Sequence, residues 1–178
     1  MTVGIFSGAG YCQPRLLGSV MKRQLLVAID GSPAADIALH QAAVLAQAMD
    51  SRLTLVHVVA VGGAGRAAGQ LMSRARQESI RQGGRQLLLG RQQQLQARFA
   101  LDSDIHLAQT LHGKRDMCAL VAKFARTTDA HLLVLARHGQ GNHQTAPMGS
   151  FVEHMLRLAP CPLLIIPFAR QPAVFAHG

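Results

Sequence analysis

The stretch that decides the fold is residues 131–167, with the sequence HLLVLARHGQGNHQTAPMGSFVEHMLRLAPCPLLIIP. Two short apolar runs, residues 132–135 and 163–166, stand near its ends and have the length and composition of strands buried on both faces. Between them a polar loop with glycines leads into residues 151–158, which have the apolar spacing of an amphipathic helix. The stretch therefore predicts a strand, a loop, a helix and a second strand.

The start of this helix has the residue types of an anion-binding site. Ser150 is expected to be its N-cap, because a serine oxygen can accept a hydrogen bond from a free backbone N–H group. Gly149 lets the backbone come close to a ligand. Since a helix N-terminus offers unpaired N–H groups and a partial positive charge, we expect a phosphate group to fit here.

The rest of the chain repeats the alternation of strand and helix. Apolar runs and helical spacing predict strands over residues 25–29, 53–59 and 104–111 and helices over residues 33–49, 70–99 and 114–127. Ser32 and Pro33 suit the N-cap and the first position of the first helix. Four strand–helix repeats and a closing strand predict an open α/β fold, with one parallel five-stranded sheet and helices on both faces.

Two segments carry additional expectations. Gly83, Gly84 and Gly90 are expected to break or fray the helix of residues 70–99, since each glycine costs about 1 kcal/mol relative to alanine. In residues 104–111, apolar side chains alternate with more polar ones, which is typical of a strand with one wetter face. We expect this strand at an edge of the sheet.

The loop of residues 136–150 resembles the nucleotide-binding motif of the universal stress proteins. That motif reads Gly, two residues, Gly, nine residues, Gly, then Ser or Thr. Gly139, Gly149 and Ser150 match its longer half, and Ala136 stands in place of its first glycine. The run Ala-Pro-Cys-Pro at residues 159–162 is also similar to the family's approach to its last strand.

This resemblance implies a strand order of 3-2-1-4-5, a homodimer formed through the last strand, and a site for an adenine nucleotide. In that order, the carboxyl ends of the first and fourth strands flank the point where ligands of open parallel sheets bind. The implied ligand is ATP, or ADP or AMP, with or without Mg²⁺. Asp30 and Val58 would lie beside the adenosine, and the loop and the backbone of the helix start beside the phosphates; the implied site residues are Asp30, Val58, Ala136, Gly139, Gly149, Ser150 and Phe151.

Each of these residues also has a simpler structural interpretation. Asp30 could hydrogen-bond its own turn, Val58 could belong to the core, and Gly149 and Ser150 could serve only the turn and the cap. Ala136 adds a methyl group where the motif has glycine, and Val152 replaces a frequent Ser or Thr. Losing one neutral hydrogen bond weakens binding by about 1 kcal/mol. A dimer of the same fold that binds no nucleotide and acts through protein partners is therefore the alternative.

The composition predicts one domain over residues 21–170, with a poorly structured extension at 1–20 and a tail at 171–178. No apolar run approaches the length of a membrane span, and the first residues do not resemble a signal peptide. Cys12, Cys118 and Cys161 are far apart, which is typical of a protein of the reducing cytosol.

The net charge of +9 is concentrated in one segment. Residues 51–101 contain eight arginines and a single acid, Glu78. This pattern would suit nucleic acid or an acidic protein. We prefer a solvated helix face, because no aromatic residues are interleaved among the arginines for base stacking.

The sequence contains no catalytic signature that we can identify. It has no nucleophile–base pair at an informative spacing, no paired carboxylates near the loop, and no P-loop lysine motif. His138 and His143 are a weak metal pattern without a carboxylate or cysteine partner, and His57 is expected to be a satisfied core histidine. We therefore expect a regulator or sensor with no metal site and, at most, slow incidental ATP hydrolysis.

Overall fold

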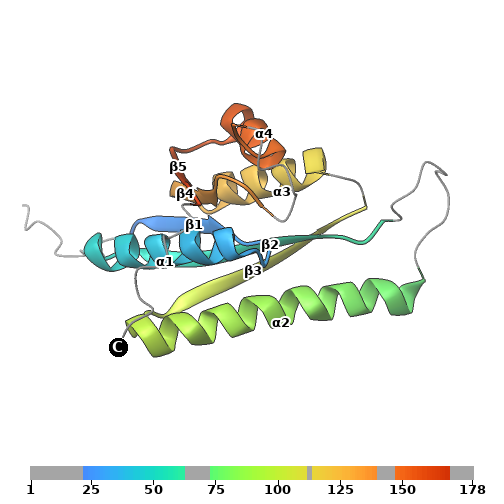
Figure 1. Ribbon diagram of the computed structural model, residues 1–178, viewed down its shortest axis with the longest axis horizontal. Helices are drawn as coiled ribbons and strands as arrows, with labels where there is room; N and C mark the ends of the chain where they lie inside the picture. The colour runs from blue at the N-terminus through green and yellow to red at the C-terminus, as the bar shows by residue number, and fades with distance from the viewer. Residues whose placement is uncertain (1–21, 63–72, 112–113, 140–146, 169–178) are drawn as a thin grey trace, which may run out of the picture.

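The structure, a computed structural model, describes residues 22–62, 73–111, 114–139 and 147–168. The predicted extension at 1–20 and tail at 171–178 lie outside these residues. The described elements alternate strictly between strand and helix (Figure 1); in chain order they are β1 (Gln24–Ala28), α1 (Pro33–Ala48), β2 (Arg52–Ala60), α2 (Arg74–Phe99), β3 (Ser103–Thr110), α3 (Lys114–Thr127), β4 (Ala130–Ala136), α4 (Ser150–Leu158) and β5 (Leu163–Ile166).

The strands of the described residues form one five-stranded sheet with the order β3-β2-β1-β4-β5, and all pairs are parallel. The predicted fold class and strand order are confirmed. β3 lies at one edge, as its alternating pattern indicated, and β5 lies at the other.

A hydrophobic core lies on each face of this sheet. On one face, the alanine-rich side of α1 and Leu88 and Leu95 of α2 pack on alternate residues of the central strands. On the other face, α3 and α4 contribute Val121 and Met155 to a second cluster. Figure 1 shows the two helix layers on opposite sides of the strands. Strands buried on both sides explain the continuous apolar runs of the sequence.

The turn before α1 forms as its residue types predict. Ser32 is the N-cap, and its side-chain oxygen accepts a hydrogen bond of 3.1 Å from the backbone N–H of Ala35. Pro33 occupies the first helical position. Gly31 has a φ of 80°, a left-handed conformation that glycine adopts without steric cost.

The predicted break in α2 is wrong. The helix runs without interruption from Arg74 to Phe99. Gly84 is buried, and a Cβ atom there would lie 2.9 Å from side-chain atoms of Leu107 and Val59. The missing side chain therefore lets α2 lie close to the sheet, and this packing outweighs the low helix propensity of glycine. Within the described residues, no helix is long and apolar enough to cross a membrane.

Candidate functional site

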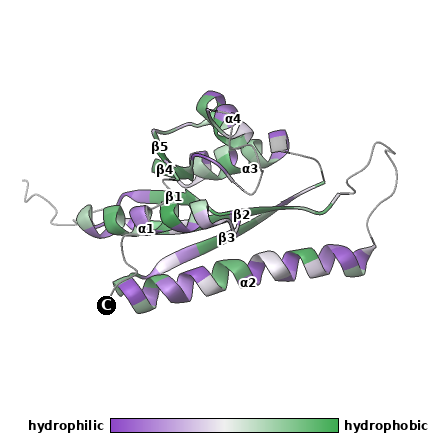
Figure 2. Ribbon diagram, viewed as in Figure 1, coloured by the Kyte–Doolittle hydropathy of each residue, from purple (hydrophilic) through white to green (hydrophobic). Residues whose placement is uncertain are grey.

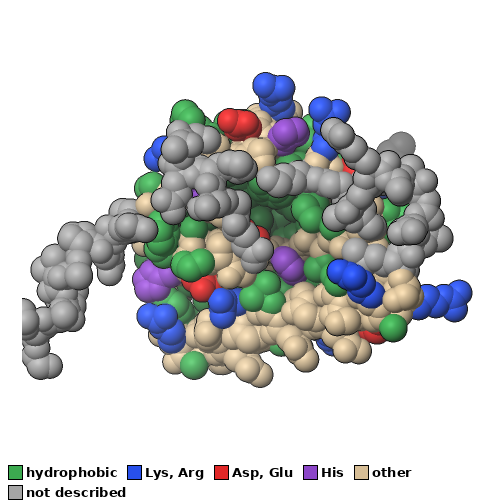
Figure 3. Space-filling view, turned by 45° about the vertical axis from the view of Figure 1, so that its right-hand side comes forward, with side chains coloured by type: hydrophobic (Ala, Val, Ile, Leu, Met, Phe, Trp, Pro, Cys, Tyr) green, Lys and Arg blue, Asp and Glu red, His purple; other side chains and the backbone are tan. Residues whose placement is uncertain are grey.

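A cavity of about 320 Å³ lies beyond the carboxyl ends of β1 and β4. These two strands are neighbours in the sheet, and the chain leaves them toward opposite faces, α1 covering one face and α4 the other. An open parallel sheet is expected to form its ligand crevice at such a point. The surface drawn in Figure 3 is hollowed near its centre, with hydrophobic side chains in the depth of the hollow.

All seven predicted site residues line this one cavity. They come from four separate parts of the chain: the end of β1, the end of β2, the end of β4 with the loop that follows, and the start of α4. The seven are Asp30, Val58, Ala136, Gly139, Gly149, Ser150 and Phe151. The sequence pattern therefore locates a real cavity, whatever ligand it takes.

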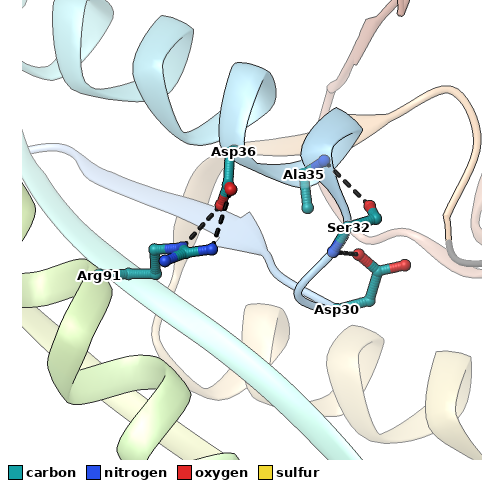
Figure 4. Close-up of polar contacts among 5 residues, drawn as sticks. All are labelled: Asp30, Ser32, Ala35, Asp36 and Arg91. Carbon is teal, nitrogen blue, oxygen red and sulfur yellow. Dashed lines mark hydrogen bonds and ion pairs between the residues drawn. The ribbon is translucent and has the colours of Figure 1, made fainter.

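Asp30 follows β1, where it hydrogen-bonds its own turn and also faces the cavity. Its Oδ1 atom accepts a hydrogen bond of 2.9 Å from the backbone N–H of Ser32, which stabilises the turn into α1 (Figure 4). Its carboxylate also lines the cavity. A Cβ atom on Gly139 would collide with Oδ2 of Asp30, so glycine at this position leaves room for the carboxylate.

Hydrogen bonds of Arg137 close the base of the loop that follows β4. The backbone N–H of Arg137 donates to the carbonyl of Ile166 at 2.8 Å, and its own carbonyl accepts from Gly149 at 2.9 Å. Its side-chain Nε donates to the carbonyl of Pro147 at 2.6 Å. The two ends of the loop are thus held together and attached to β5.

The prediction that Ser150 is the N-cap of α4 is wrong by one residue. Gly149 is the N-cap, with φ −72° and ψ 144°, and Ser150 is the first helical residue. The backbone N–H of Glu153 donates to the carbonyl of Gly149, which completes the first turn. A Cβ atom here would lie 3.1 Å from the carbonyl oxygen of Arg137, which is a tight contact, so glycine suits this position.

The inner wall of the cavity is apolar. Met117 and Val121 of α3 line it together with Leu135 of β4 and Val152 of α4. Val152 is only 2% exposed. Its side chain, which stands where the motif often has Ser or Thr, therefore belongs to this wall. An apolar wall with few polar groups is typical of small-molecule sites.

Cys118 lies next to this wall and is chemically inert at neutral pH. Burial raises the pKa of its thiol to about 11, so the thiol remains protonated. Its sulfur lies 3.6 Å from the carbonyl oxygen of Phe151, to which the thiol donates. The cysteine therefore links α3 to the first turn of α4 without supplying a nucleophile.

Three polar residues outside the predicted set also line the cavity. His57 is satisfied, as expected, because its Nδ1 lies 2.6 Å from the carbonyl oxygen of Ile29, yet it also lines the cavity. Arg137 and His138 line it too, and their positions directly after a strand end could have indicated this. His143 lies outside the described residues. Among the described residues, no group of three or more potential metal ligands occurs.

The family model and the similar solved structures reported next all name one protein family. A model of the Universal stress protein family matches residues 21–167. The chain is similar to the solved structure of universal stress protein UspA from Lactobacillus plantarum, with a TM-score of 0.69 and 21% sequence identity, covering 81% of this chain and 97% of that chain. A universal stress protein family structure from Burkholderia pseudomallei has a TM-score of 0.63 and 29% sequence identity. The match covers 83% of this chain and 98% of that chain. A search of curated proteins found no match.

Two further similar structures are complexes with adenine nucleotides. A universal stress protein in complex with cAMP has a TM-score of 0.50 and 17% identity, covering 83% of this chain and 98% of that chain. A universal stress protein from Archaeoglobus fulgidus in complex with dAMP has a TM-score of 0.50 and 20% sequence identity. The match covers 82% of this chain and 98% of that chain. At these identities the likeness shows a shared fold.

Proposed function

Because this chain belongs to the universal stress protein family, we propose that its cavity binds an adenine nucleotide: ATP, or the related ADP or AMP. The bound protein acts as a regulator or sensor in the cytosol. The adenosine lies between Asp30 and Val58, and the phosphates lie along the loop that leads from Gly139 to Ser150.

The observation that carries this proposal is the meeting of all seven motif residues in one cavity. Taken singly, each of them has a structural role, such as the hydrogen bond of Asp30 to its own turn. The parallel sheet brings the strand ends together, and the residue types found there, a carboxylate, glycines and a helix start, suit a phosphorylated ligand. Glycine at position 139 also leaves room for the carboxylate of Asp30 beside the cavity, which supports a polar contact with a ligand there.

Two relatives of the same fold support the class of ligand, since they are complexes with cAMP and dAMP. Mg²⁺ enters with the nucleotide in this proposal. It is held mainly by phosphate oxygens and water, as Mg²⁺ usually is at nucleotide sites. Asp30 is the one carboxylate among the described residues that line the cavity.

Calorimetric titration with ATP, ADP and AMP, each with and without Mg²⁺, tests the proposal directly. Ala136 narrows the approach to the backbone and Val152 removes a hydroxyl group, so we expect dissociation constants on the order of micromolar to sub-millimolar. Mass spectrometry of ligand released from the purified protein identifies the preferred nucleotide. Absence of heat and of competition at millimolar ATP would reject nucleotide binding and favour the dimer that acts through protein partners.

We also propose a homodimer formed through β5. This strand stands at an edge of the sheet, and all four of its residues are apolar and partly exposed. Leu156 and Leu158, near the end of the helix that precedes it, are 54% and 40% exposed. An apolar edge strand invites pairing with another chain. Light scattering at micromolar concentration should give twice the monomer mass, and a monomer there would contradict the proposal.

A further inference from the structure

Arg137 places a positive charge in the wall of the cavity. It is the first residue after β4, it is partly buried, and it lines the cavity together with Gly139 and Ser150. The hydrogen bond from Nε to the carbonyl of Pro147 holds its side chain against the end of the loop. The position of the guanidinium group is thus determined before any ligand arrives.

Most of the hydrogen-bonding capacity of this guanidinium is unused within the described residues. Arginine has five N–H donors, and of these only Nε–H has a partner there. The ion pairs of the described residues join other side chains, namely Lys22 with Asp50, Arg81 with Glu78, and Arg91 with Asp36. Residues 140–146 read QGNHQTA and contain no acidic residue.

We propose that Arg137 selects phosphorylated ligands by binding a phosphate group with the terminal amino groups of its guanidinium. This inference rests on the proposed function and names the residue that recognises the charge of the ligand. A guanidinium can bind phosphate with two parallel, charge-assisted hydrogen bonds, which are stronger than neutral ones. Arg137 thereby replaces the hydroxyl contact that Val152 cannot make.

Arg137→Gln is the variant that tests charge recognition. It removes the positive charge and the hydrogen bond of Nε to Pro147, but it leaves both backbone hydrogen bonds of residue 137, to Ile166 and Gly149, because neither involves the side chain. The adenosine titration and the thermal midpoint report any effect on the loop. Arg85→Gln is the matched control. Arg85 is exposed on α2, does not line the cavity, and forms no ion pair within the described residues.

The experiment is a calorimetric titration of the full chain with ATP and with adenosine, which share the base and ribose but differ in charge. We expect Arg137→Gln to weaken ATP binding about 10- to 100-fold and to change adenosine binding less than about threefold. Arg85→Gln should match the parent with both ligands. Arg137→Lys should recover part of the ATP affinity, because it restores the charge without the planar pair of donors.

Each other outcome overturns the inference in an identifiable way. Unchanged ATP binding in Arg137→Gln shows that another group recognises the phosphates, while the proposed nucleotide function stands. Equal loss of ATP and adenosine, with a lowered thermal midpoint of the unliganded variant, shows that Arg137 acts only through the loop. A parent protein that binds neither ligand rejects the proposed function and this inference together.

Discussion

The crevice between β1 and β4 and the layer that α2 forms on β2 and β3 use glycine in opposite ways. At Gly84 of α2, the missing Cβ leaves space that Leu107 and Val59 fill from the sheet. At Gly139 in the crevice, the missing Cβ leaves space for the carboxylate of Asp30, which borders a cavity. Both glycines permit close approach, but one approach buries apolar surface and the other positions a polar group. We therefore expect the α2 layer to determine stability and the crevice to determine binding.

The charges of the two regions differ as well. α2 contains six arginines and one acid, and hydrophilic segments alternate with white and green ones along its ribbon in Figure 2. Arg91 forms two hydrogen bonds, of 2.6 and 2.9 Å, with the carboxylate of Asp36 in the first turn of α1 (Figure 4). Arg81 pairs with Glu78 one turn away. These pairs fit the preferred interpretation of a solvated helix face, while binding of nucleic acid by α2 stays a hypothesis that a steep salt dependence would support.

The largest expected effect is on stability, at Gly84. Gly84→Val should lower the free energy of unfolding by about 1–3 kcal/mol, because its side chain overpacks the contact with Leu107 and Val59. Gly83→Ala is the matched control, since no atom lies within 4 Å of its Cβ position. That variant should gain up to about 1 kcal/mol from helix propensity. Denaturant unfolding measures both, and a tolerated Gly84→Val would contradict the close packing.

The next effect is on binding, at Gly139. Gly139→Ala should displace the carboxylate of Asp30 and weaken nucleotide binding by about 1–2 kcal/mol, comparable to losing one hydrogen bond to a charged group. The free energy of unfolding should fall by about 1 kcal/mol at most, because moving the carboxylate also disturbs its hydrogen bond from Ser32. Calorimetry with ATP measures the change. Equal affinities of variant and parent would show that Asp30 does not position the ligand.

A smaller effect of opposite sign is expected at Ala136, the last residue of β4. Ala136→Gly should tighten nucleotide binding by less than about 1 kcal/mol, because it removes the methyl group from the cavity wall. The same change should cost about 0.5–1 kcal/mol of stability, since glycine weakens a strand. Affinity and stability thus move in opposite directions, and weaker binding would show that the methyl group is a useful contact.

The smallest effect is a pH dependence at His106 of β3. Its ring stacks on Phe124 of α3 at 3.7 Å, and burial lowers its pKa below the ordinary value of 6.5. The unfolded chain therefore binds a proton more readily, so His106 should reduce stability as the pH falls below about 6.5. His106→Phe retains the aromatic stack and should flatten this part of the pH profile. The free energy of unfolding is measured with urea at several pH values from about 7.5 to about 5. If it changes with pH equally in the parent and in His106→Phe, the assignment is contradicted.

The sequence by itself determined the elements and, together with the family resemblance, pointed to the cavity that forms the candidate site. The apolar runs of β4 and β5, the cap at Ser32 and the limits of α3 all depend on residues within a few positions of each other, so a linear pattern contains them. The site followed from a rule about strand ends together with a motif of fixed spacing. The strand order was implied only by the family resemblance, because local patterns do not say which strands become neighbours.

Only the tertiary structure decided how the glycines and the cavity arginine act. Gly84 reads as a helix breaker in the sequence, but the strands that it contacts are distant along the chain. Gly149 is the N-cap in place of Ser150 and its N–H donates to the carbonyl of Arg137, and Arg137 reaches Pro147 across the loop. Such contacts join residues far apart in sequence, and their energies depend on distances of a few tenths of an ångström. Linear patterns contain no such distances, so these roles became visible only once the chain was folded.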